Sequence, residues 1–506
     1  MDIKRISIKL REDKKYLVPL CIYVSLFLSF CSKMSPLYPV NEWGDINVYF
    51  NIGKSIFSGM TLYSEIFDHK GPLIFFIYGL GALVSGSSFI GVFVLQLLGW
   101  LTAATAAFYT ARLYISKLPA FIIALLLPFS FLTYMYTGGS AEEMILLFSV
   151  VSMYLFIKHF KDGKTQHPPR YMFVHGVLSC MALLIKINLV LFWFFPLLAI
   201  FIGLLINREY KNFLQNSAAY ISGVSLILAP VLLYFICNGA LSEAYHVYIE
   251  LNKQYSSTDD YAYLLTNGLN KLYKAYRSEL VWYIIITTGI FYFPAKWIKG
   301  RLNQAAIGLS GVVLFLIIFF PLTFHFYYPL PLLIFVTLGL ISIFAFLEQY
   351  ITVKETKKLI YFILIFILLA GINKQNFFNL GADQLLRKGY ENEPQFVFKD
   401  QIMKENSPTL LNIAFGEGNA LFTTTGLTPH LKYFFSPNIY YNMYPEIRDS
   451  QSEYIINKET MFIVDCTDGF NYDFFQTFAP LKENYTLTDS TTVSGGQTYY
   501  LYKRKN

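Results

Sequence analysis

Long apolar segments recur along almost the whole chain, and they restrict its possible folds more than any other feature of the sequence. A helix needs about 20 residues to cross a hydrocarbon core about 30 Å thick. Only 14% of the 506 residues are charged and 55% are hydrophobic, whereas about 25% of the residues of a soluble protein are charged. The sequence therefore predicts an all-α polytopic membrane protein with about 11 transmembrane helices. The predicted spans are 17–36, 91–111, 118–136, 143–157, 171–187, 189–206, 217–237, 280–295, 305–322, 329–347 and 358–372.

Charge and cysteine usage exclude several classes of protein. In a membrane protein, the net charge of +7 reflects Lys and Arg residues that orient the helices, so no nucleic-acid partner is expected. Four of the five cysteines lie in or beside apolar segments, which argues against a disulfide framework. The histidines lack the i,i+4 spacing of a zinc site, and no metal ligand set is predicted. The first apolar segment lacks a convincing cleavage site, and we expect it to remain as the first span.

The segment 72–84 is too short to span as a helix, because its 13 residues reach only about 20 Å. The positive-inside rule fixes its interpretation. If 72–84 does not cross, the Lys- and Arg-rich segments, including 1–16, 158–170 and 295–301, all lie on the inner side, and the short connections 137–142 and 323–328 on the outer side carry no Lys or Arg. We therefore predict an interfacial or re-entrant helix at 72–84.

This topology collects most of the unexplained polar residues on the outer side. The stretch 41–70, the loop 238–279 and everything after about residue 373 are predicted to be extracytoplasmic. Residues 1–372 are predicted to form the transmembrane domain, and 373–506 a small extracytoplasmic α/β domain. In the latter, "TLLNIAF" and "MFIVDC" are typical of buried strands, and "TTVSGGQTYYLYKRK" is typical of a hairpin with a Gly-Gly turn.

The outer polar residues suit transfer of a group from a phosphate-linked donor. Such a reaction needs a carboxylate that takes the acceptor's proton, and cations or hydrogen-bond donors that stabilise the phosphate leaving group. Asp45 fits the first role, and Lys70, Lys186 and His325 fit the second. No outer nucleotide-binding fold is evident, so a lipid carrier is the natural donor, and a groove after Gly71-Pro72 would hold its tail.

Each of these residues also has a structural interpretation. Asp45 could cap a helix that begins near Val48. Asp68, His69 and Lys70 could anchor an interfacial helix, with Lys70 extending toward water. The remaining alternatives are N-terminal helix acids for Glu142 and Glu143, a turn residue of a helical hairpin for Lys186, and a residue of the interfacial aromatic belt for His325.

Several motifs together resemble one known family of folds. Asp45 follows the first predicted span, and Gly59–Tyr63 and Asp68–Pro72 follow it as "GMTLY" and "DHKGP". "SAEEM" begins the fourth predicted span, and "HFYYPLPLL" lies at 325–333. This pattern resembles membrane glycosyltransferases of the GT-C fold, in the branch of the protein O-mannosyltransferases and the bacterial lipid A aminoarabinose transferases. The resemblance covers roughly residues 16–350.

The resemblance implies an inverting glycosyltransferase (hexosyl- or pentosyltransferase) in the inner, or plasma, membrane. It would move a sugar from a polyprenyl-phosphate donor to a glycan, lipid or protein acceptor on the extracytoplasmic face, with membrane lipid around it. Asp45 would be catalytic. The substrate-binding residues would be Asp68, His69, Lys70, Glu142, Glu143, Lys186, His325 and Tyr328. Gly71 replaces the usual first proline of the turn and no second acid pair is evident, so no cofactor is certain and a divalent cation stays open.

Two other functions compete with this one. A flippase or transporter of lipid-linked saccharides would bury charges in mid-membrane and show paired broken helices, which the sequence does not suggest. An oligosaccharide polymerase or ligase would work on the same outer face, but usually has an arginine-rich outer loop in mid-chain. The loop 238–279 contains a single arginine, Arg277.

Overall fold

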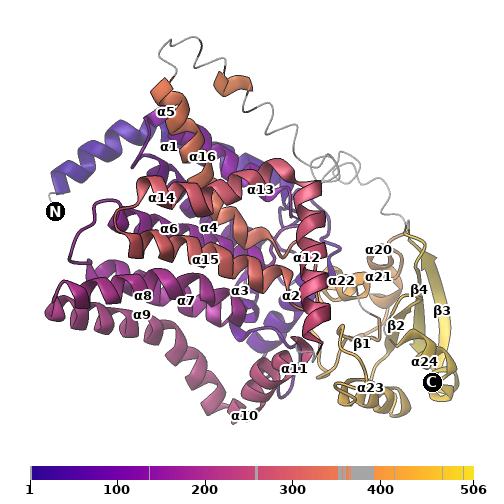
Figure 1. Cartoon of the computed structure of the whole chain (residues 1–506). Helices are drawn as coiled ribbons and strands as arrows, with labels where there is room; N and C mark the ends of the chain where they lie inside the picture. The colour runs from indigo at the N-terminus through magenta and orange to yellow at the C-terminus, as the bar shows by residue number, and fades with distance from the viewer. Residues whose placement is uncertain are drawn as a thin grey trace. The chain divides into compact units, whose positions relative to one another are not determined.

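The structure is a computed structural model of the chain. It describes residues 3–135, 137–256, 260–350, 356, 360–363, 365, 392–414, 416–469, 471–493 and 495–505. The chain divides into two compact units (Figure 1). Unit 1 consists of Met1–Cys31, Gln96–Pro230 and Thr258–Asn379, and unit 2 of Ser32–Leu95, Val231–Ser257 and Leu380–Asn506. The predicted domain boundary at 372/373 lies outside the described residues.

Unit 1 is built from helices throughout its described residues. Its elements are α1 (Ile3–Cys31), most of α4 (Ile90–Ala111), α5 (Lys117–Phe131), α6 (Ala141–Phe160), α7 (Pro169–Leu183), the 3-10 turn η1 (Ile187–Val190), α8 (Leu191–Ile206), most of α9 (Tyr210–Cys237), α12 (Tyr261–Ser278), α13 (Leu280–Thr287), the π-helical η3 (Thr288–Tyr292), α14 (Phe293–Trp297), α15 (Arg301–Phe319), the 3-10 turn η4 (Leu330–Leu333) and α16 (Ile334–Tyr350). The helix α8 packs against α15, and α6 packs against α7 (Figure 1).

The described residues contain eight helical segments that are long and apolar enough to cross a membrane, which makes the chain a multi-pass membrane protein. They are Asp13–Cys31, Ile90–Ala111, Ala141–Phe160, Ile187–Ile206, Tyr210–Cys237, Leu280–Trp297, Arg301–Phe319 and Leu330–Tyr350. The predicted spans 118–136 and 171–187 correspond to α5 and α7, each 15 residues long. The predicted span 358–372 lies almost wholly outside the described residues. The total of about 11 crossings stays a prediction.

Glycines let helices of unit 1 approach closely, as is common in membrane proteins. A Cβ atom on Gly176 of α7 would lie 2.3 Å from the carbonyl oxygen of Tyr220 in α9. A Cβ atom on Gly223 of α9 would lie 2.2 Å from the carbonyl oxygen of Phe173. A side chain at either position would push the two backbones apart, so Gly176 and Gly223 fix the crossing of α7 and α9.

Unit 2 begins with α2 (Gly44–Phe57) and α3 (Pro72–Ala82), which pack against each other. The helix α3 contains 11 residues and is therefore only about 17 Å long. A short helix at 72–84 is thus confirmed, while its interfacial position stays a prediction. The following short helices of the unit are α10 (Leu241–Tyr245), the π-helical η2 (His246–Leu251) and α11 (Asn252–Ser256).

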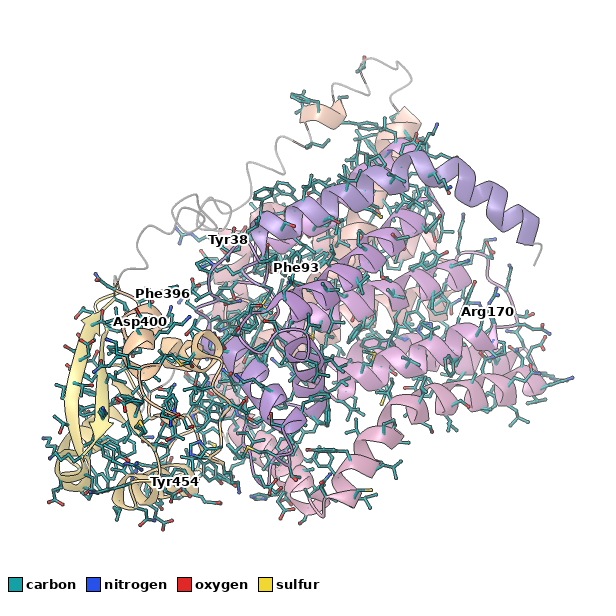
Figure 2. All side chains as sticks on the ribbon, turned by 180° about the vertical axis from the view of Figure 1, so that it is seen from behind. Tyr38, Phe93, Arg170, Phe396, Asp400 and Tyr454 are labelled. Carbon is teal, nitrogen blue, oxygen red and sulfur yellow. The ribbon has the colours of Figure 1, made fainter. Side chains whose placement is uncertain are left out.

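The C-terminal part of unit 2 is a small α/β module, as predicted. Its sheet has the strand order β1-β2-β4-β3; β1 pairs with β2 in parallel, and the other pairs are antiparallel. The strands are β1 (Leu410–Asn412), β2 (Phe462–Cys466), β3 (Tyr485–Thr492) and β4 (Thr498–Arg504), and the helices are α20 (Pro394–Val397), α21 (Lys399–Ile402), η5 (Gly416–Asn419), α22 (Ala420–Thr425), α23 (Glu446–Ile456), α24 (Tyr472–Thr477) and α25 (Ala479–Asn484). In Figure 2, Phe396 marks α20, Asp400 marks α21 and Tyr454 marks α23.

Candidate functional site

Four of the predicted site residues form one cluster in unit 1, called here the Lys186 cluster: Glu142, Lys186, His325 and Tyr328. The Nζ atom of Lys186 donates a hydrogen bond of 2.5 Å to Oε1 of Glu142. The same Nζ atom lies 3.7 Å from the centre of the Tyr328 ring. The rings of Tyr328 and His325 are edge to face, with centres 5.2 Å apart. Residues far apart in the sequence thus lie together at helix ends, as predicted.

Local backbone geometry positions each member of the Lys186 cluster. Lys186 is extended, with φ −151° and ψ 99°, in the tight connection between α7 and η1, so the predicted helical hairpin is confirmed. Gly138 and Gly139 both have φ near +90°, a conformation that favours glycine. Their turn leads directly into α6 and places Glu142 in its first turn.

The electrostatics of the Lys186 cluster suit an anionic ligand. The Glu142 side chain is 4% exposed, whereas that of Lys186 is 25% exposed. Glu142 therefore compensates the lysine charge from the buried side, and the Tyr328 ring face adds a cation–π contact. The ammonium group has three donor hydrogens, so it can donate to a phosphate oxygen while it retains its hydrogen bond to Glu142.

Glu143 has a different environment from that of its neighbour. Its Oε1 atom accepts hydrogen bonds from Nε2 of Gln96 at 2.8 Å and from Nε1 of Trp100 at 2.6 Å. Its Oε2 atom accepts from the backbone N–H of Gly139 at 2.5 Å, while its own N–H donates to Oγ of Ser140. This buried carboxylate holds the turn before α6, so we propose that Glu143 positions Glu142 and does not bind substrate.

Asp45, the predicted catalytic residue, lies in unit 2 in the first turn of α2, where it is half-buried. The alternative that Asp45 caps a helix starting near Val48 is wrong. The helix begins at Gly44, and Trp43 occupies the N-cap position without a side-chain cap hydrogen bond. An acid in the first helical turn still interacts favourably with the helix dipole.

Asp68 and His69 are buried and build the turn before α3. The Oδ1 atom of Asp68 accepts the His69 backbone N–H at 2.6 Å and lies 3.0 Å from His69 Nδ1. Burial alone would raise the pKa of Asp68, but the hydrogen bond and charge of His69, together with the charge of Lys70, hold that pKa below its usual value. Asn252 fixes the turn further by donating to the His69 carbonyl at 2.5 Å.

Lys70 is half-buried at the end of this turn. Its carbonyl oxygen accepts a 2.7 Å hydrogen bond from the hydroxyl of Tyr63. Tyr63 has φ +69°, a conformation uncommon for a residue other than glycine. We propose that Asp68 and His69 act as positioning residues, and that Lys70 remains the candidate phosphate contact of this segment.

One polar face of α2 was missed by sequence reasoning. Lys54 is buried, and its Nζ atom donates to the carbonyl oxygens of Leu427 at 2.5 Å, Phe422 at 3.3 Å and Gly86 at 3.3 Å. Burial lowers the pKa of Lys54 to about 7. Asn51 contacts the same C-terminal segment, donating to Thr423 at 3.2 Å.

A sequence signal for this face does exist. Asn47, Asn51, Lys54 and Ser55 recur at the spacing i, i+4, i+7 and i+8, which places polar side chains on one side of a helix. All four bond to backbone or side-chain atoms of residues 419–429. The stretch 41–70 and the C-terminal module are therefore parts of one unit.

Among the described residues, no group of three or more His, Cys, Asp or Glu side chains could hold a metal ion. The candidate metal ligands among the described residues are therefore single acids and the Asp68–His69 pair.

The fold is that of GT-C membrane glycosyltransferases, as the motifs suggested. The oligosaccharyltransferase of Archaeoglobus fulgidus tethered with an acceptor peptide is 13% identical, with a TM-score of 0.54, over 98% of this chain and 75% of that one. ArnT from Cupriavidus metallidurans bound to undecaprenyl phosphate is 12% identical, with a TM-score of 0.57, over 95% of this chain and 97% of that one.

A sequence match to a family supports this likeness. Residues 69–235 match the model of the dolichyl-phosphate-mannose-protein mannosyltransferase family. The matched segment contains His69, Lys70, Glu142, Glu143 and Lys186. No protein of curated function matches the sequence. The resemblance predicted from the motifs is therefore confirmed at the level of the GT-C fold and of this family segment.

Proposed function

We propose that the protein is an inverting membrane glycosyltransferase, which moves a sugar from a polyprenyl-phosphate donor to an acceptor on the extracytoplasmic face. The observation that carries the proposal is the contact of Lys186 with Glu142 and Tyr328. It supplies a cation at helix ends, and two of its three residues lie within the family match. The undecaprenyl phosphate bound to ArnT supports a lipid phosphate as the leaving group.

The chemistry assigns a role to each residue group. As the bond between the sugar and the phosphate breaks, negative charge grows on the phosphate, and we assign to Lys186 of unit 1 the charge-assisted hydrogen bond that stabilises it. The resemblance implies the same role for Lys70 of unit 2. Asp45 takes the proton of the acceptor hydroxyl as that oxygen attacks the anomeric carbon from the opposite side, which inverts the configuration. His325 and Tyr328 complete the phosphate-binding surface beside Lys186.

The extracytoplasmic location follows from the distribution of charge in the loops. The loops at 158–170 and 295–301 are rich in Lys and Arg, whereas the connections at 137–142 and 323–328 lack both. The second pair of loops leads to Glu142 and His325, so the Lys186 cluster lies on the side opposite the basic loops. We infer that this side is the outer side of the plasma membrane.

Release of polyprenyl phosphate from a panel of polyprenyl-phosphate sugars tests the proposal. Supplied with a glycan, lipid or protein acceptor that receives the sugar, the purified protein in uncharged detergent should release polyprenyl phosphate from one donor, and Lys186→Gln should slow that release. Lys296→Gln, which removes an exposed lysine at the end of α14, is the matched control and should not change the rate.

A parallel arm separates the competing functions. Proteoliposomes loaded with a labelled lipid-linked saccharide report movement across the bilayer without bond cleavage. Translocation in the absence of any polyprenyl phosphate release would replace the transferase with a flippase. Formation of products with several repeat units would instead indicate a polymerase or ligase.

A further inference from the structure

A cavity of about 250 Å³ lies in unit 1, at the ends of α8 and α15. It is bordered by the last turns of α8, the loop between α6 and α7, and the connection between α14 and α15, and it is open on one side. Arg170, labelled in Figure 2, is the second residue of α7, directly after that loop. These are the basic loops, so the cavity is on the side opposite the Lys186 cluster.

Two lysines give the cavity a positive rim. Lys164 lies 3.2 Å from Asp162, but the side chain of Lys164 is 68% exposed and that of Asp162 is 49% exposed. An exposed ion pair of this kind contributes little to the free energy of folding. A phosphate can therefore displace Asp162 from Lys164. The exposed side chain of Lys299 packs along Gly163: a Cβ atom added to Gly163 would lie 3.3 Å from the Cβ atom of Lys299. No acidic partner of Lys299 is found in the part of the chain that the structure describes.

Further hydrogen-bonding groups line the same cavity. The side-chain amides of Asn207 and Asn303 each donate one N–H to a carbonyl of their own segment, at 2.7 and 2.9 Å. An amide has two N–H groups, so each can donate once more. His159 also lines the cavity, and its Nδ1 atom is buried without a hydrogen-bond partner among the described residues.

The wall formed by α8 is apolar. Ala199, Ile200 and Leu204 line it, and they belong to the candidate membrane span Ile187–Ile206. A site with a cationic rim above an apolar wall suits a phosphate group that carries hydrocarbon chains. Its volume is slightly below the roughly 300–1,000 Å³ of sites for drug-sized ligands, which suits a phosphate with a small substituent better than a nucleotide.

We propose that this cavity binds the phosphate group of an anionic ligand on the cytoplasmic side, with an anionic phospholipid head group as the occupant that its apolar wall favours. Basic pockets between transmembrane helices are suited to such head groups. The inference goes beyond the proposed transfer reaction and does not depend on it.

One glycine allows a test that leaves the charge unchanged. Gly203 lines the cavity within α8, and a Cβ atom added there meets no heavy atom within 4 Å. Gly203→Leu should therefore place a branched side chain in the cavity and reduce its volume, and it replaces glycine by a better helix former. Lys164→Gln/Lys299→Gln removes the rim charge instead. Lys296→Gln, on an exposed lysine outside the cavity lining, controls for general loss of surface charge.

Native mass spectrometry of the full chain counts the lipid molecules retained from phosphatidylglycerol micelles and from phosphatidylcholine micelles. In a third arm without lipid, thermal unfolding measures stabilisation by inorganic phosphate. A thermal unfolding scan confirms that each variant folds. We expect selective retention of phosphatidylglycerol by the unmodified protein. The variant that lacks both lysines should bind it about 25-fold more weakly, at about fivefold per lysine near a membrane surface, and Gly203→Leu should reduce retention because its side chain narrows the cavity. Release of polyprenyl phosphate in uncharged detergent should be unchanged in both variants.

The outcomes are decisive in each direction. If inorganic phosphate alone stabilises the protein and Gly203→Leu removes that effect, the site is supported and its occupant is free phosphate. If Gly203→Leu retains phosphatidylglycerol as the unmodified protein does, the cavity is not the site. Equal losses in Lys296→Gln and in the lysine pair would show general surface attraction, and would also overturn the proposal.

Discussion

Replacement of Lys186 by methionine separates the structural from the functional role of the Lys186–Glu142 pair. The change removes the ammonium group and retains most of the side-chain length. It leaves the Glu142 carboxylate, which is 4% exposed, without its cation. Breaking a buried ion pair typically costs 3–5 kcal/mol. Because Lys186 itself is 25% exposed, we expect the lower end of that range, about 3 kcal/mol.

A second substitution should restore the stability but not the activity. In Lys186→Met/Glu142→Gln no lone charge remains, so the free energy of unfolding should return to within about 1 kcal/mol of the unmodified protein. The coupling between the two positions would then be about 2–3 kcal/mol. Unfolding titrations of the two single variants and the double variant in detergent measure this coupling.

The transfer rate should depend on the ammonium group of Lys186 and not on the free energy of unfolding. Loss of a charge-assisted contact with the donor phosphate costs about 1.5–3 kcal/mol, which is roughly ten- to 150-fold in kcat/KM for the polyprenyl-phosphate donor. The stable double variant should therefore be as slow as Lys186→Met. Recovery of kcat/KM together with stability would refute the phosphate role and leave the pair as a structural element.

Four further predictions concern other residues. Asp45→Asn should fold and bind donor but lose about 10²–10⁴-fold in kcat, as expected on removal of a general base; near-normal turnover would exclude Asp45 as the base. Lys70→Ala should raise the donor Kd about tenfold or more without a matching loss of stability, and an unchanged Kd would remove Lys70 from the site. In a cysteine-free background, externally added maleimide should label Asp400→Cys but not Lys164→Cys, and the reverse pattern would invert the topology. The pKa of Lys54 is about 7 in the folded chain, below that of an unfolded lysine, so between about pH 7 and pH 10.4 the unfolded chain binds one more proton than the folded chain. The free energy of unfolding should therefore rise with pH in that window, by up to about 1.4 kcal/mol per pH unit. Lys54→Met should show a flatter pH dependence of unfolding, and equal slopes would contradict the buried amine.

The helical part of the fold was predictable because its signal is local. A run of apolar residues needs no partner to be recognised as a span, and the position of Pro72 at the start of α3 follows from the fixed φ of proline. The terminal hairpin was also predictable, since Gly496 has φ +86° at the Gly-Gly turn. Each of these features is determined by residues adjacent in sequence.

The candidate site was predictable only in its residue types. The helix ends brought Lys186, Glu142 and Tyr328 together, as expected from the topology. The sequence could not separate Glu142 from Glu143, because adjacent residues point about 100° apart around a helix and the neighbours of each come from other helices. Nor could it show that α2 starts as early as Gly44, since Trp43 is not a preferred N-cap residue.

The docking of α2 on the C-terminal module determines when the stretch 41–70 can reach its final structure during synthesis. Asn51 finds its partners at Asn419 and Thr423, and Lys54 finds two of its three acceptors, 368 or more residues further along the chain. At about 5–20 residues per second, the ribosome needs on the order of 20–70 s to make that length. Through this interval the spans already inserted can pack, but the amine of Lys54 has no acceptors at Phe422 and Leu427. The helix that carries Asp45 therefore completes these contacts only after residues 419–429 have been made, so a chain truncated before them lacks the contacts that hold its proposed catalytic acid in place.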